Sequence, residues 1–180
     1  LRMYQEQAKS IVNETKAKQL LVALEKTFHK NEMLGAPKKA LIFTESRRTQ
    51  EYLKSFLQNN GYKEKVVCFN GSNNDDDSKS IYRKWLSLYA GSKRISGRTI
   101  IDRKQALVDH FRTDAEIMIA TESGAEGINL QFCSLLVNYD MPWNPQRIEQ
   151  RIGRCHRYGQ KFDVVVVNFV NQLNYADCRV

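Results

Sequence analysis

The sequence predicts an α/β fold in which a parallel sheet is covered by helices on both faces. Short, continuously apolar segments alternate with longer segments of helical periodicity along the chain. Strands of this kind are typical of parallel sheets that are buried between two helical layers. The 180 residues, of which 42% are hydrophobic, are enough for one domain of ordinary size with its own core.

Each strand is predicted by a short apolar run that is too short for a helix. The five runs are 40–43, 65–69, 116–120, 135–138 and 164–169. In parallel sheets, function lies in the loops that leave the carboxyl ends of the strands. In this chain those loops begin at Thr44, Asn70, Thr121 and Tyr139.

Helices are predicted between these strands from the spacing of apolar residues and from capping residues. They span 5–31, 47–60, 81–90 and 102–111, and one more begins at Asn144 and Pro145. Residues 91–99 are predicted to form a polar loop. We therefore divide the chain into an N-terminal helical lead-in, 1–37, and a lobe that contains the sheet, 38–180.

The positive charge of the chain is concentrated in one segment. The net charge is +8, and Lys79 to Lys104 carry eight basic residues against one acid, Asp102. Such a segment can contact a phosphate backbone, or it can be a solvated surface, and its composition leaves both readings open.

The sequence does not indicate a membrane protein, a secreted protein or a metal-binding protein. No segment approaches the roughly 18 apolar residues that span a bilayer, and the first residues show no signal-peptide pattern. Cys68, Cys133, Cys155 and Cys178 lack the close pairing that is typical of zinc sites. We expect a cytoplasmic protein with reduced cysteines, no metal site of its own and no membrane partner.

A phosphate-binding loop is absent from the sequence. The nearest candidate, residues 91–99, has its glycines one residue too far apart, and Arg98 replaces the required lysine. No acidic pair follows an apolar strand in a position to hold Mg²⁺. The 180 residues therefore lack the groups that bind ATP phosphates and their metal ion without help.

The last predicted helix carries stacked arginines. Arg147, Arg151 and Arg154 recur on neighbouring turns, and Glu149 is the one carboxylate nearby in the sequence. Unpaired guanidinium groups repel each other, so this helix is either a solvated basic surface or a site for an anion. Gly153 costs roughly 1 kcal/mol of helix stability relative to alanine, and we expect another group to pack closely against it.

Five segments resemble conserved motifs of superfamily 2 helicases and occur in the family's order. Residues 150–160 read QRIGRCHRYGQ, which resembles motif VI with the ending found in Swi/Snf-type translocases. The other four resemble motif IV (41–44), the short motif after it (70–72), motif V (120–130) and the segment between motifs V and VI (143–146). The resemblance covers roughly residues 38–170 and is strongest to bacterial RapA-like members.

This resemblance implies the second, C-terminal RecA-like lobe of an ATP-dependent translocase acting on nucleic acid, with double-stranded DNA expected. ATP and Mg²⁺ would be held mainly by an N-terminal helicase lobe of the same full-length chain. The 180 residues alone are expected to be inactive as an ATPase. The alternative is a stand-alone nucleic-acid-binding or regulatory docking module with no role in hydrolysis.

The resemblance also assigns residues to the nucleotide cleft. Arg154 and Arg157 fall on the arginine-finger positions, and Gln150 falls on a position that helps to set the catalytic geometry. Gly127 and Asn129 fall where motif V lines the cleft.

A second set of residues falls near the nucleic-acid track, where hydroxyls and backbone amides contact phosphates. The set comprises Thr44, Arg47, Gly71, Ser72, Thr121 and Trp143. Arg47 could instead balance surface charge, and Trp143 could be a core anchor. The link at about 73–104 is longer than the family's pattern and contains the basic segment, so it is either a DNA-facing insertion or a surface excursion.

Overall fold

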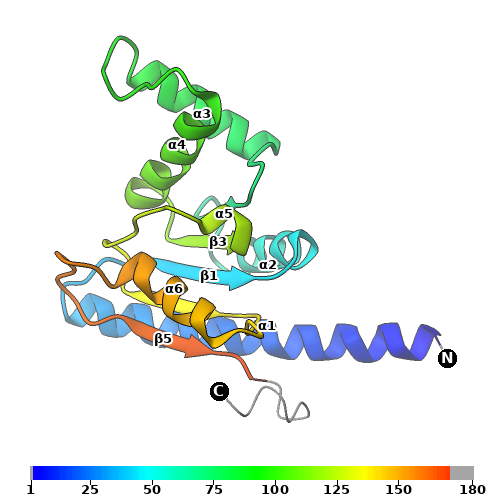
Figure 1. Ribbon diagram of the computed structural model, residues 1–180. Coiled ribbons are helices and arrows are strands. Elements are labelled where there is room, and N and C mark those ends of the chain that lie inside the picture. Colours follow the sequence, from blue (N-terminus) through cyan, green and yellow to red (C-terminus); the bar gives the residue numbers. More distant parts are fainter. Residues whose placement is uncertain (1, 171–180) are drawn as a thin grey trace.

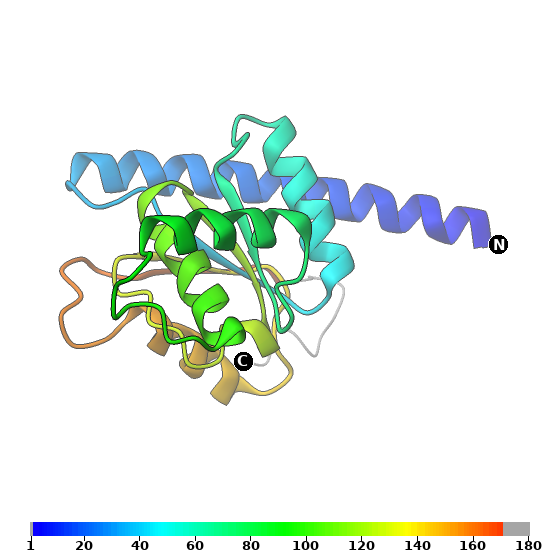
Figure 2. The same ribbon diagram turned by 90° about the horizontal axis from the view of Figure 1, so that it is seen from above.

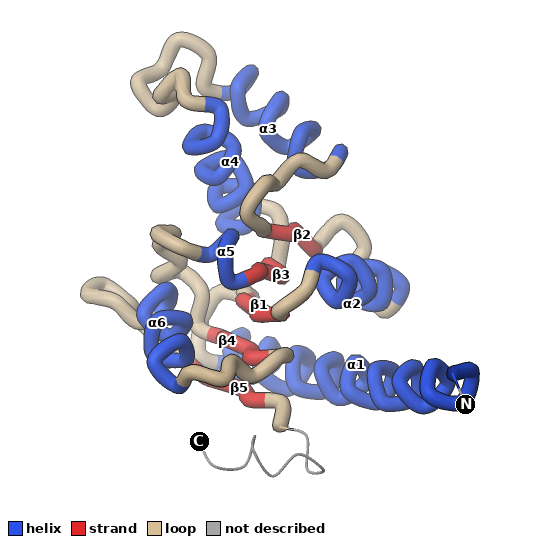
Figure 3. Tube along the Cα trace, turned by 45° about the vertical axis from the view of Figure 1, so that its right-hand side comes forward, coloured by secondary structure: helices blue, strands red, loops and turns tan. Residues whose placement is uncertain are grey.

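A computed structural model describes residues 2–170, with side chains described from residue 14 onward. Its five strands form one parallel sheet in the order β2-β3-β1-β4-β5 (Figure 1). The strands are β1 (Ala40–Thr44), β2 (Val66–Phe69), β3 (Ile117–Thr121), β4 (Leu135–Asn138) and β5 (Val165–Asn168). Figure 3 shows them stacked in this order. The predicted parallel sheet is confirmed.

Helices cover both faces of the sheet. They are α1 (Arg2–Met33), α2 (Arg47–Asn59), α3 (Asp76–Leu88), α4 (Thr99–Thr113), α5 (Glu122–Ala125) and α6 (Pro145–Cys155). One hydrophobic core lies under α1 and α2, and the other lies under α4, α5 and α6. Figure 2 shows α1 and α2 on one side of the strands and α6 on the other.

The second half of α1 contributes to the core of the lobe. Its residues Ala17, Leu20, Leu24 and Phe28 are buried against the sheet together with residues of α2. The domain boundary between 37 and 38 remains a prediction, but the helix before it packs directly on the strands that follow.

Polar side chains fix where several helices begin. Ser46, Asp75 and Asn144 each accept a hydrogen bond from a backbone N–H in the first turn of α2, α3 and α6. Pro145 then occupies the first turn of α6, where its missing N–H costs nothing. Because Asp75 caps it, α3 begins five residues before the predicted start at residue 81.

The basic segment folds into a hairpin of α3 and α4, which projects from the β2 side of the sheet (Figure 1). Trp85 is buried between the two helices, and its Nε1 donates to Asp109 Oδ2 at 2.8 Å. Arg94 Nη2 donates to the same oxygen, also at 2.8 Å. These contacts make the segment a packed element, which we call the α3–α4 hairpin (residues 76–113).

Across residues 2–170, no helix is long and apolar enough to cross a membrane.

Candidate functional site

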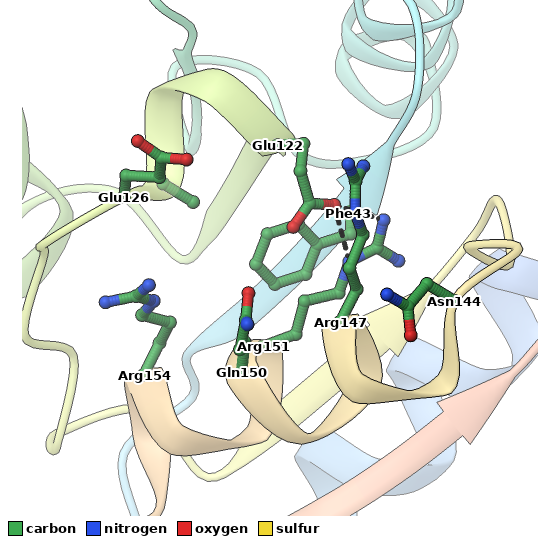
Figure 4. A pocket seen from close by; sticks show the side chains of 9 residues that line it. Phe43, Glu122, Glu126, Asn144, Arg147, Gln150, Arg151 and Arg154 are labelled. Atoms are coloured by element: carbon green, nitrogen blue, oxygen red, sulfur yellow. Dashed lines mark hydrogen bonds and ion pairs between the residues drawn. The ribbon is translucent and has the colours of Figure 1, made fainter.

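A pocket of about 240 Å³ lies between α5 and α6 at the carboxyl ends of the strands. It is lined by Phe43, Glu122, Ala125, Glu126, Asn144, Arg147, Gln150, Arg151 and Arg154. Figure 4 shows the three arginines and Gln150 rising from α6 toward the two glutamates of the opposite wall. The pocket thus sets three guanidinium groups against two carboxylates.

Two of the three predicted catalytic residues line this pocket. Gln150 and Arg154 stand one turn apart on α6 and point into the same space (Figure 4). Arg157 lies beyond the end of α6, in an exposed turn, and is not among the residues that line the pocket. The structure of this lobe therefore brings Gln150 and Arg154 together in the pocket, whereas Arg157 lies in the exposed segment after α6.

The loop with the two predicted cleft residues is attached to the end of α6. Gly127 has a positive φ of 77°, a conformation that favours glycine, and both Gly127 and Asn129 are exposed. The next residue, Leu130, donates its backbone N–H to the carbonyl of Arg154 at 2.9 Å. This bond places Asn129 close to the carboxyl end of the helix that carries Arg154.

Arg151 was not predicted to be a site residue. It is only 2% exposed, and its guanidinium is paired with Glu122, at 3.0 Å from Nε and 2.6 Å from Nη2. Its Nη1 donates to Asn138 Oδ1 at 2.8 Å and to the carbonyl of Asp140 at 3.0 Å. The expectation that the arginines of α6 lack a carboxylate partner is therefore wrong for this residue. The fold supplies the carboxylate from another element.

A sequence signal for the burial of Arg151 does exist. Cys155 follows it by four residues and is also buried, so the two share the face of α6 that points to the sheet. An arginine on an inward face must find partners in the interior, because an unpaired buried charge is strongly unfavourable.

The expectation of close packing at Gly153 is wrong for this lobe. A Cβ atom built on Gly153 meets no described atom within 4 Å. Gly124 shows the opposite situation. Its Cβ would lie 2.7 Å from Asn70 Cα and 2.8 Å from the Phe69 carbonyl oxygen, so α5 approaches the end of β2 as closely as only glycine permits.

Thr44 and Thr121 are register partners at the carboxyl ends of adjacent strands. Both are buried, but their hydroxyl groups differ. Thr44 Oγ1 donates to Asp140 Oδ2 at 2.8 Å, whereas Thr121 Oγ1 has no hydrogen-bond partner among the described residues. A buried hydroxyl without a partner is costly, and this one is enclosed at the end of β3.

The other predicted nucleic-acid residues form a cluster at the end of β2, apart from Trp143. Arg47 Nη2 donates to Ser72 Oγ at 2.8 Å, and Ser72 in turn donates to Asn70 Oδ1 at 3.2 Å. Gly71 is exposed beside them. Arg47 therefore holds a loop hydroxyl and makes no ion pair with a described carboxylate.

Trp143 stands in the loop before α6 and is 82% exposed. The alternative that it anchors the core is therefore wrong. A large, exposed aromatic ring at the carboxyl edge remains available to an external ligand.

The basic residues of the α3–α4 hairpin differ in whether they have partners within the chain. Arg94 is paired with Asp109 and lies 4.2 Å from the ring centre of Tyr89, and Arg103 donates to the carbonyl of Asn73. Lys93 and Arg98 are exposed in the loop between the helices. Only part of the basic segment is thus free to meet a phosphate backbone.

The cysteines do not form a reactive or metal-binding centre in the described part of the chain. Cys68, Cys133 and Cys155 are free thiols, and Cys178 lies outside the described residues. A hydrogen bond with Cys133 and burial both raise the pKa of Cys155, and burial raises the pKa of Cys68 to about 12. These two thiols stay protonated at neutral pH. Between residues 2 and 170, no group of three or more His, Cys, Asp or Glu side chains could hold a metal ion.

Comparison with protein families finds a helicase domain. The family described as the helicase conserved C-terminal domain matches residues 84–159. This range includes most of the α3–α4 hairpin and extends to the turn after α6.

Two curated relatives are named as helicases. The chain is 44% identical over 134 residues to the uncharacterized ATP-dependent helicase YqhH of Bacillus subtilis, which is 74% of this chain and 19% of that protein. It is 32% identical over 137 residues to the helicase SWR1 of Saccharomyces cerevisiae, which is 74% of this chain and 7% of that protein. The chain thus spans a fifth or less of these relatives' length.

A solved structure of similar fold is the C-terminal part of the Fun30 ATPase domain. The two share a TM-score of 0.60 at 23% identity, over 87% of this chain and 41% of that one. This likeness supports the assignment of the fold.

Proposed function

Because this chain belongs to the Swi/Snf-type helicases as a helicase C-terminal domain, we propose that it is the second lobe of an ATP-driven translocase on double-stranded DNA. In this proposal, an N-terminal lobe of the same full-length chain holds ATP and Mg²⁺. The C-terminal domain supplies arginines to the nucleotide and part of the track for the nucleic acid.

The observation that carries this proposal is the position of Arg154 beside Gln150 in the pocket at the carboxyl edge. The residues fit a polyphosphate. Glu122 is neutralised by the buried Arg151, which leaves Arg147 and Arg154 to face an anion across from Glu126. A guanidinium fixed on a helix stabilises the negative charge that spreads over phosphoryl oxygens during transfer. Bound ATP would supply the reacting phosphoryl group.

The further cleft residues have distinct roles in this proposal. Arg157, in the exposed segment after α6, would act with Arg154 as a second arginine finger, and Gln150 would help to orient the reacting groups. Asn129 would bond a ribose hydroxyl, and Gly127 lets the backbone come close to the nucleotide.

The nucleic-acid track would run along the carboxyl edge of the sheet. The exposed ring of Trp143 supports this placement, and Thr121 lies at the same edge as the last residue of β3. Thr44 and the cluster of Arg47, Gly71 and Ser72 would complete it. Hydroxyl groups and loop amides of this kind contact phosphates without reading the base sequence. The exposed Lys93 and Arg98 of the α3–α4 hairpin would add contacts to the DNA backbone.

The central experiment measures DNA-stimulated ATP hydrolysis of the full-length protein with Arg154→Ala or Arg157→Ala. We expect each change to lower kcat on the order of 10³-fold or more. The KM for ATP should change little, because an interaction made only in the transition state does not affect ground-state binding. Lysine should rescue poorly, since an ammonium group lacks the planar fork that spans two oxygens.

The matched control is Arg112→Ala. Arg112 is exposed near the carboxyl end of α4, beside the amino end of β3, and thus at the opposite edge of the sheet. Arg147 is unsuitable as a control because it lines the same pocket as Arg154. If folded Arg154→Ala and Arg157→Ala proteins both hydrolyse ATP like the wild type, the chain is instead a binding or docking module with no role in hydrolysis.

A further inference from the structure

The first turn of α4 exposes two adjacent apolar side chains, those of Ile100 and Ile101. They are 73% and 50% exposed, and Arg98, directly before this turn, is exposed as well. An apolar pair beside a cation fits a ligand that offers an apolar surface together with negative charge. Duplex DNA is such a ligand, because its stacked bases are flanked by phosphates.

This turn lies at the carboxyl edge of the sheet, on the flank of the proposed nucleic-acid track. Arg103 Nη1 donates to the carbonyl of Asn73 and to Asn74 Oδ1, both at 3.2 Å, in the loop that follows β2. Ile100 precedes Arg103 by three positions and therefore shares its face of the helix. Since α4 runs from here toward the amino end of β3, its first turn stands just beyond the loop that carries the track residues 71 and 72.

The same turn is held in place from both sides. The carboxylate of Asp102, a residue that is 2% exposed, accepts hydrogen bonds from the Ser96 N–H at 2.9 Å, the Ser96 hydroxyl at 2.7 Å and the Gly97 N–H at 3.0 Å. These bonds fasten the preceding loop to the start of α4, and Arg103 fastens the next turn to the loop after β2. The two isoleucines are therefore positioned before any ligand binds.

Side chains of this kind can distort a duplex. Isoleucine and other apolar residues that insert between base steps unstack the bases, while neighbouring arginines and lysines contact the backbone. Unstacking costs free energy, so an inserted side chain must stand on a support that does not yield. The bonds of Asp102 and Arg103 provide that support at the first turn of α4.

We propose that Ile100 and Ile101 form an apolar wedge that enters the bound duplex at a base step and unstacks it, while Arg98 contacts a neighbouring phosphate. This inference rests on the proposed function, and it adds a distortion of the duplex to the proposed movement along DNA. Because pyrimidine–purine steps such as TA open most easily, the wedge should favour duplexes that contain them.

The test uses the full-length protein without ATP and short duplexes that carry 2-aminopurine beside a TA step, at successive positions. At saturating protein, the wild type should increase 2-aminopurine fluorescence, because this base fluoresces more strongly when it is unstacked. Replacing Ile100 and Ile101 together by serine should abolish the increase and weaken binding about tenfold. The slope of log affinity against log salt concentration should not change, because no phosphate contact is lost.

The matched control is Leu88→Ser. Leu88 is 74% exposed and belongs to the same hairpin, but it lines a cavity with Lys65 and Thr113, on the side of the amino ends of the strands. Its loss should leave fluorescence and affinity unchanged. Replacing both isoleucines by leucine keeps the apolar volume and should retain most of the fluorescence increase. Thermal melts identify unfolded variants, and the single serine variants replace the double one if it fails to fold.

Two outcomes would overturn the inference. One is a fluorescence increase in the double serine variant that equals that of the wild type. The other is a wild-type protein that binds the duplexes and changes the fluorescence at no position. Because the measurement contains no ATP, it can fail while Arg154→Ala still abolishes hydrolysis, and only the wedge is then wrong. Loss of hydrolysis in the double serine variant, with the wild-type fluorescence response kept, would show that the isoleucines contact protein and not DNA.

Discussion

Gly124 and Gly153 are both helical glycines of the predicted motifs, yet the structure gives them opposite surroundings. At Gly124 a methyl group would overlap the backbone of Asn70, whereas at Gly153 it would enter open space. A close backbone contact within this lobe therefore requires glycine at position 124. At position 153 no described residue of this lobe requires glycine.

We expect Gly124→Ala to destabilise the 180-residue chain by about 1–3 kcal/mol, because the backbone of α5 or of the β2 loop must move. Gly153→Ala is the matched control, and it should stabilise the chain by up to about 1 kcal/mol through helix propensity. Urea unfolding curves of both variants check this. Destabilisation of similar size at both positions would show that Gly153 is packed against another group and does not face open space.

Individual residues show which contacts the sequence predicts and which it does not. Arg154 and Gln150 are predicted from a motif on one helix, and the structure places both in one pocket. The pairing of Arg151 with Glu122 spans 29 positions, and that of Thr44 with Asp140 spans 96. Such pairs arise only when the strands lie side by side, so a pattern along one segment cannot reveal them.

Among the elements, the predicted strands agree closely with the structure, while the helices differ at their ends. The apolar runs mark the strands directly, because both faces of each strand are covered. The one-turn helix α5 was not predicted, since four residues cannot display helical periodicity. The packing of α3 on α4 was also not predicted, because it depends on Trp85 and Asp109, which lie 24 positions apart.

The α3–α4 hairpin provides a prediction about nucleic-acid binding. Replacing Lys93 and Arg98 together by alanine should weaken DNA binding of the full-length protein about equally for all sequences. Each lost phosphate contact should also reduce the slope of log affinity against log salt concentration by roughly one. Titrations of labelled duplexes at several salt concentrations measure both effects. Unchanged affinity and slope would show that the hairpin is a surface element that does not contact DNA.

Arg94→Ala serves as the structural comparison for this double variant. Arg94 is bonded to the nearly buried Asp109, so its loss should lower thermal stability. Any effect of Arg94→Ala on DNA affinity should be smaller than that of the double variant.

At the scale of the whole molecule, the proposed catalytic site is incomplete within these 180 residues. It offers arginines to an anion, but the 180 residues contain no phosphate-binding loop and no acidic pair for Mg²⁺. We expect the purified 180-residue chain to show no ATP hydrolysis above background, with or without DNA. A sensitive phosphate-release assay checks this. Turnover that survives purification and disappears in Arg154→Ala would reveal a complete site within this chain.

The whole sheet also shows a limit of prediction from the sequence. The number of strands and their parallel direction follow from their composition and from the helices between them. The order of the strands does not, because β1 and β2 are neighbours along the chain but are separated by β3 in the sheet.

The strand order also affects how the chain folds during its synthesis. β1 pairs with β3 and β4, and β2 pairs with β3 alone. When the ribosome has made both early strands, neither has a partner, and no part of the sheet can close until Thr121 has been added. Pairing between such distant segments carries a large entropic cost and is slow. The two apolar strands that emerge first therefore lack a strand partner while residues 70–116 are being made, and during this interval they are exposed to aggregation.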